Sequence, residues 1–63
     1  MVDIEVRNEG SIFLFCPHSP RGSEWIRDNV PDNAQWWGSM LVVEHRYAYD
    51  LTQGMLDDGL EVS

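Results

Sequence analysis

The chain has 63 residues, and its eleven Asp and Glu against four Arg and no Lys give a formal net charge of −7. A chain this short buries only one hydrophobic core, so we expect one domain over residues 1–63. Nucleic acids and anionic lipids are bound by basic surfaces, so the charge argues against direct binding to either and leaves a basic protein as a fitting partner.

The cysteine count bears on the compartment. Cys16 is the only cysteine, which excludes an intrachain disulfide and fits a reducing compartment, so we expect a cytoplasmic protein. No apolar run approaches the roughly 20 residues that span a bilayer, and no basic stretch followed by an apolar one opens the sequence, so neither a membrane span nor a leader is expected.

The first predicted elements are two strands that form a hairpin. Apolar and polar residues alternate over Val2–Arg7, the period-two pattern of a strand with one buried face. Asn8-Glu9-Gly10 then provides a turn, because glycine takes a positive φ at little cost. Ser11–Cys16 follows as a second, more continuously apolar strand.

A helix of about ten residues is predicted next. Ser19-Pro20 marks its start, because a serine side chain caps free amides and proline suits the first helical position. Trp25-Ile26 and Val30 supply an apolar stripe at helical spacing, and Pro31 ends the helix.

A third strand is predicted over Ser39–His45, which is rich in β-branched residues and is expected to be central in the sheet. From Tyr47 the apolar positions take helical spacing, and Gly59 suits the left-handed residue that ends a helix in a Schellman motif. Gly54 lies inside this second helix, where glycine costs about 1 kcal/mol relative to alanine, so we expect that turn to pack closely on the sheet.

Leu60–Val62 can add a short terminal strand, which completes the order ββαβαβ. This order predicts an α+β fold, a single small two-layer sandwich made of one sheet with two helices on one face.

Several segments resemble a group of small uncharacterised bacterial and phage proteins of similar length. The resemblance implies a bacterial or bacteriophage origin, and because the group has no assigned activity it transfers no functional residue. The segments that carry it extend over nearly the whole chain and are Arg7–Ile12, Trp25-Ile26, Leu41–Tyr47, Gly54-Met55 and Asp58–Leu60.

The adjacent tryptophans Trp36 and Trp37 are the first candidate for an interaction site. Neighbouring side chains on a strand-like segment point to opposite faces, so at most one of the two rings can enter the core. We expect the other on the sheet face that has no helices, where exposed aromatic surface marks an interface. The alternative is a loop that curls one indole over the edge of the core.

A polar cluster, Glu44-His45-Arg46-Tyr47, follows the predicted central strand, where ligand sites of open sheets often lie. The structural alternative is that His45 or Arg46 caps strand-end carbonyls and pairs with Glu44 or Asp50, while Tyr47 packs under the second helix.

Acidic residues at helix ends form a third candidate. Asp57 and Asp58 end the second helix and Asp28 lies near the end of the first, where the partial negative charge of the helix terminus disfavours a carboxylate. Folding does not explain this choice, so these residues are candidates for contact with a cationic partner. The alternative is that the charge serves solubility.

Cys16, His18 and His45, with Glu44, can be combined into a thiol–imidazole pair or a zinc site. The spacing matches no known zinc motif, and Cys16 continues an apolar strand as a small hydrophobic residue. We therefore predict no catalytic residue, no cofactor and no metal.

The leading hypothesis is a non-enzymatic protein–protein interaction module, self-associating as a homodimer, with another protein as partner. One alternative is an acidic DNA-mimic inhibitor of a nucleic-acid-binding protein, and another is a small Cys/His enzyme or metal-binding protein. The predicted interaction residues are Trp36, Trp37, Glu44, His45, Arg46, Asp57 and Asp58.

Overall fold

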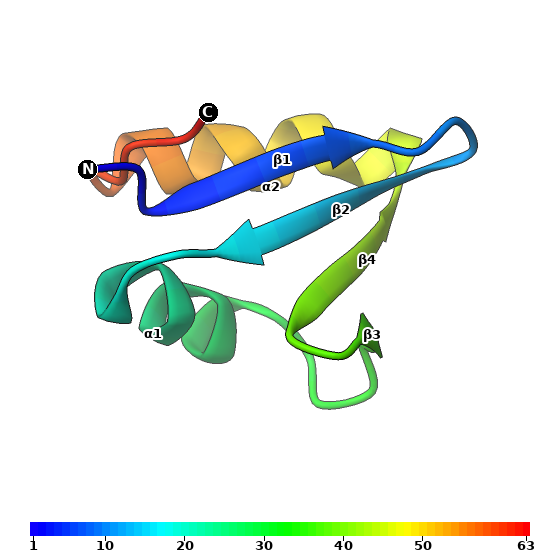
Figure 1. The fold of residues 1–63 in the computed structure, drawn as a ribbon, viewed down its shortest axis with the longest axis horizontal. Helices are drawn as coiled ribbons and strands as arrows, with labels where there is room; N and C mark the ends of the chain where they lie inside the picture. The colour runs from blue at the N-terminus through cyan, green and yellow to red at the C-terminus, as the bar shows by residue number, and fades with distance from the viewer.

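The computed structural model describes residues 1–63. Its elements are β1 (Ile4–Asn8), β2 (Ile12–Pro17), α1 (Pro20–Asn29), β3 (Gln35–Trp37), β4 (Met40–Glu44) and α2 (His45–Asp57). The four strands form one antiparallel sheet in the order β1-β2-β4-β3, and both helices pack on the same side of it (Figure 1). The predicted α+β class with two helices on one face is confirmed.

The predicted β1–β2 hairpin is present. In its turn the Asn8 side-chain oxygen accepts a hydrogen bond from the Gly10 amide at 3.0 Å, and the Glu9 amide donates to the Ile12 carbonyl at 2.9 Å. Gly10 has a φ of +92°, a conformation that residues with a Cβ rarely take.

Both predicted ends of α1 are confirmed. The Ser19 hydroxyl accepts a hydrogen bond from the Gly22 amide at 3.0 Å, and Pro20 occupies the first helical position. The helix ends at Asn29, because Val30 has extended backbone angles ahead of Pro31.

The strand β3 was not predicted as an element. Gly38 and Ser39 join β3 to β4 with Trp37 opposite Met40, and the Gly38 φ of +59° fits a two-residue type II′ hairpin turn. With β3 on one side and β2 on the other, β4 is central, as predicted. The predicted terminal strand is reduced to a parallel bridge between Val62 and Ile4 at the outer edge of β1.

The helix α2 follows β4 without a loop and begins at His45, two residues before the predicted start at Tyr47. Its predicted Schellman ending is confirmed: the Gly59 amide donates to the Leu56 carbonyl and the Leu60 amide to the Met55 carbonyl, both at 3.0 Å.

Gly54 does lie in a close contact, but the prediction that this contact is with the sheet is wrong. A Cβ at Gly54 would meet the ring of Trp25 on α1, with the nearest ring carbon at 3.2 Å. Close packing at this turn therefore joins the two helices.

The core lies between the sheet and the helices. In the cross-strand register, Ile4 and Val6 of β1, the phenylalanines of β2 and Leu41 and Val43 of β4 share the face that α1 and α2 cover. Its fully buried large side chains are Phe15, Ile4, Ile26, Leu41 and Met55.

A buried carboxylate joins the chain ends to the start of α1. Asp3, 7% exposed, accepts a hydrogen bond from the Ser19 hydroxyl at 2.6 Å and another from the Glu61 amide at 2.8 Å. Gly22 packs so closely on this segment that an added Cβ would overlap the Asp3 carbonyl oxygen. We call this region, from Asp3 and Ser19 to Glu61, the closed corner.

The hydrogen bonds at the Asp3 carboxylate lower its pKa. The Glu61 amide is the largest cause and the Ser19 hydroxyl the second, and together they outweigh the opposing effect of burial. Asp3 is therefore ionised in the folded chain at neutral pH, with a partner for each carboxylate oxygen.

Candidate functional site

The two tryptophans lie on opposite sides of the sheet, and neither ring enters the core. Trp36 pairs with Leu41 on the helix side and is 44% exposed, beside Ile26 and Val30 at the edge of the core. Trp37 pairs with Met40 on the side without helices and is 57% exposed.

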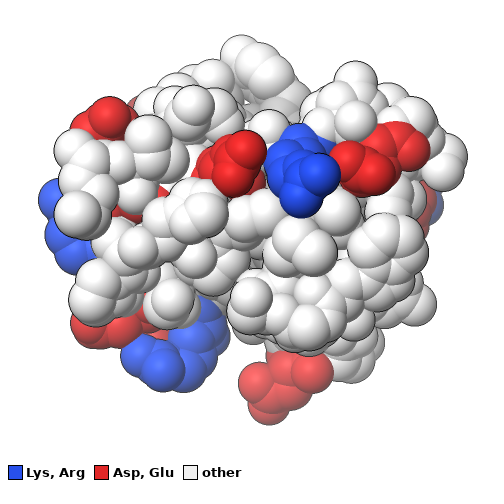
Figure 2. All heavy atoms as spheres, in the orientation of Figure 1, with Lys and Arg blue, Asp and Glu red and all other residues white.

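Apolar side chains also cover the sheet face that carries Trp37. Leu14 and Cys16 on this face are 3% and 7% exposed although no helix lies over them. Figure 2 shows this face with uncharged atoms across its middle and most charged groups along β1 or at the outline. We call the apolar set the open strip: Ile12, Leu14, Cys16, Trp37, Met40 and Val42.

Charges of both signs border the open strip. Arg7 lies 3.9 Å from Glu9, and the His18 ring nitrogen lies 2.9 Å from a carboxylate oxygen of Glu5. These side chains are about half exposed, so the pairs contribute little to stability but fix the positions of charged groups at the border. In Figure 2 the carboxylates stand at separate places rather than in one patch.

The thiol of Cys16 and the imidazole of His45 do not meet. Cys16 lies toward one end of β2. At the other end Ile12 pairs with Glu44, and His45 follows Glu44 in the chain. The His45 ring instead packs against Phe13, with ring centroids 4.5 Å apart. No group of three or more His, Cys, Asp or Glu that could hold a metal ion is present.

The environment of Cys16 also opposes thiolate formation. Burial raises the pKa of its thiol, and the nearby Glu5 carboxylate adds to the increase. An attacking or metal-binding cysteine needs the opposite shift, so the geometry and the electrostatics both favour the role of a small hydrophobic residue.

The polar cluster after β4 is partly an ion pair, as the structural alternative predicted. The Arg46 guanidinium lies 3.4 Å from a Glu44 carboxylate oxygen and 5.0 Å from the centre of the Tyr47 ring. The expectation that Tyr47 packs under α2 is wrong, because its side chain is 55% exposed.

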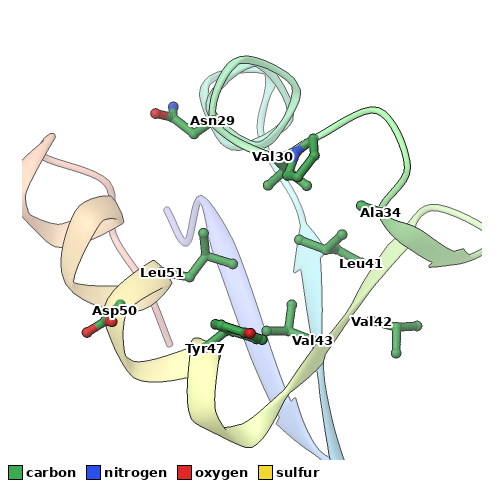
Figure 3. A pocket seen from close by; sticks show the side chains of 10 residues that line it. Asn29, Val30, Ala34, Leu41, Val42, Val43, Tyr47, Asp50 and Leu51 are labelled. Carbon is green, nitrogen blue, oxygen red and sulfur yellow. The ribbon is translucent and has the colours of Figure 1, made fainter.

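Tyr47 instead lines a groove of about 480 Å³ where the end of α1 diverges from the start of α2. In Figure 3 the side chains of Val30, Leu41, Leu51 and Tyr47 point toward one space, and those of Asn29 and Asp50 lie at its rim and point outward. We call this feature the helix groove; its ten lining residues are Asn29, Val30, Pro31, Ala34, Leu41, Val42, Val43, Tyr47, Asp50 and Leu51.

The two acids at the end of α2 differ in their contacts. A carboxylate oxygen of Asp58 accepts a hydrogen bond from the Trp25 indole N–H at 2.6 Å, and the Arg21 guanidinium donates to the adjacent Gly59 carbonyl at 2.9 Å. Folding therefore does explain Asp58, contrary to the interpretation of the sequence. Asp57 is exposed and makes no hydrogen bond or ion pair.

Neither helix has the length and apolar composition needed to cross a bilayer. No protein-family model, curated protein or solved structure matches this chain. The resemblance to small bacterial and phage proteins therefore stays a prediction, and function has to be argued from the surfaces described above.

Proposed function

We propose that the chain is a non-enzymatic interaction module that forms a homodimer through the open strip, in the cytoplasm. The observation that carries the proposal is an apolar strip with Trp37 57% exposed on a sheet face that no helix covers. An uninterrupted apolar run such as Ile12–Cys16 is typical of a strand with both faces covered, and here helices cover only one of the two faces.

A second copy fits this face in chemistry. A twofold interface brings each patch against itself, so Arg7 of one copy can meet Glu5 or Glu44 of the other across the border of the strip.

The net charge gives the homodimer a distinctive dependence on salt. Two copies that each carry a net charge of −7 repel one another, and added salt screens that repulsion. Apolar burial is not weakened by salt, so self-association should strengthen as NaCl is raised. A DNA-mimic inhibitor bound to a basic target would show the reverse trend.

Sedimentation equilibrium over a range of concentrations and salt tests the proposal. Tryptophan is enriched among interface hot spots, so Trp37→Ser should raise the dimer dissociation constant by at least about tenfold. The matched control is Tyr49→Ser, which removes a 70% exposed ring from α2, away from the open strip, and should change the constant less than about twofold. A wild-type chain that stays monomeric at high micromolar concentration and high salt would contradict the proposal.

A further inference from the structure

The helix groove is a second surface, which shares only Val42 with the open strip and otherwise lies on the helix side of the sheet. It is built from the end of α1, the loop before β3, the helix-side face of β4 and the first turns of α2. At about 480 Å³ it falls within the size range of sites that hold a ligand or a large side chain. Seven of its ten lining residues are apolar, which sets the first requirement on an occupant.

The charge of the lining sets the second requirement. Asp50 is the one charged residue that lines the groove, and it is exposed. The nearest residue of opposite sign in the sequence, Arg46, is already paired with Glu44 at 3.4 Å. The neighbouring hollow under Trp36 is lined by both Arg27 and Asp32, so it has no excess of either sign. The helix groove therefore favours an occupant that carries a cation next to an apolar group. The neighbouring hollow under Trp36 has no such preference.

We propose that the helix groove binds a segment of a partner protein in which a leucine-sized or aromatic side chain lies next to lysine or arginine. The apolar side chain would enter between Val30, Leu51 and the ring of Tyr47, and the cation would pair with Asp50. The net charge of −7 would speed the encounter with such a segment and make binding sensitive to salt.

An amide NMR titration with a defined probe tests this assignment. The probe is a blocked peptide with two central leucines between lysine triplets; one control peptide has serines for the leucines and another has glutamates for the lysines. The probe should shift the amides of Val30, Ala34 and Leu51, and neither control should. Shifts spread evenly over all acidic regions would show general charge attraction and overturn the proposal.

One matched pair of variants and a third, single variant sharpen the test. Asp50→Asn should weaken probe binding about three- to fivefold, the range of an exposed ion pair, while Asp57→Asn, which changes the net charge equally from the same helix, should change it less than about twofold. Ala34→Leu should fill the groove and weaken binding at least about tenfold. Equal effects of the two aspartate variants would contradict the proposal even if Ala34→Leu failed to fold.

The same titration distinguishes a partner protein from a second copy of this chain as the occupant of the groove. Groove shifts that depend on the concentration of the chain itself, without peptide, would identify a second copy as the occupant and overturn the proposal. Trp37→Ser should bind the probe as the wild type does, so loss of the homodimer and loss of groove binding are separate results.

Discussion

The two ends of the α1–α2 pair are built differently. Where α1 begins and α2 ends, the Trp25 indole donates to Asp58, Arg21 donates to the Gly59 carbonyl, and the Ser19 hydroxyl donates to Asp3. Where α1 ends and α2 begins, no side-chain hydrogen bond joins the helices, and an apolar groove separates them. The contrast indicates that specific bonds fix the fold at one end and leave an apolar surface uncovered at the other.

The largest expected effect comes from crowding the closed corner. Gly22→Ala places a Cβ against the carbonyl oxygen of Asp3, which is backbone and cannot turn aside. Alanine gains about 1 kcal/mol in helix propensity, but the overlap should cost more, so we expect a net loss of about 2–3 kcal/mol in the free energy of unfolding, measured by urea denaturation.

Gly54→Ala is the matched control for Gly22→Ala. Its added Cβ meets only the ring edge of Trp25 at 3.2 Å, a side chain that can shift by a few tenths of an ångström. We expect its free energy of unfolding to stay within about 1 kcal/mol of wild type, because the gain in helix propensity offsets the adjustment. Similar losses for both variants would show that the closed corner is no more rigid than the middle of the helix pair.

A smaller effect is expected from the Ser19–Asp3 hydrogen bond. Ser19→Ala removes both the cap of α1 and one bond to the carboxylate, and should lower the free energy of unfolding by about 1–2 kcal/mol at neutral pH. Ser23→Ala, at an exposed position of the same helix, is the control and should change it by less than about 0.5 kcal/mol.

The Ser19 bond, together with the larger effect of the Glu61 amide, also makes stability depend on pH in acid. The folded pKa of Asp3 is lowered below its ordinary value of 3.8, so its contribution is complete above that pH and is lost as the pH falls through the lowered value. Ser19→Ala should raise the pKa of Asp3 in the folded chain toward 3.8. The free energy of unfolding should then fall less in acid, as measured by urea denaturation across the acid range. An unchanged acid profile would show that Ser19 acts only as a helix cap.

Sequence patterns predicted the features whose partners are close in the chain. The cap of α1 joins Ser19 to Gly22, three residues apart, and the ending of α2 needs only Gly59 and Leu60, so both could be read locally. The strand β3 was missed because three residues show little alternation, although Gly38-Ser39 is a recognised two-residue hairpin turn.

Features that depend on tertiary packing were not predictable in this way. The partner of Asp58 is Trp25, 33 residues earlier, and no spacing rule connects the two. The helix groove arises from the divergence of α1 and α2, so its apolar lining was read as core, and Tyr47 was wrongly placed under α2. Alternation on a strand sends neighbouring rings to opposite faces, so it was predictable that one tryptophan lies on the face without helices, but not that this is Trp37.

The smallest expected effect lies at the open strip and bears most directly on function. Trp37→Ser, studied at concentrations where the chain is monomeric, should change the free energy of unfolding by less than about 1 kcal/mol, because a ring 57% exposed has little contact to lose. The same change should strongly weaken self-association. A tryptophan that matters for association but little for folding is one retained for recognition. A loss above about 2 kcal/mol in the monomer would instead show that the indole stabilises the β3–β4 hairpin, and its exposure would no longer indicate an interface.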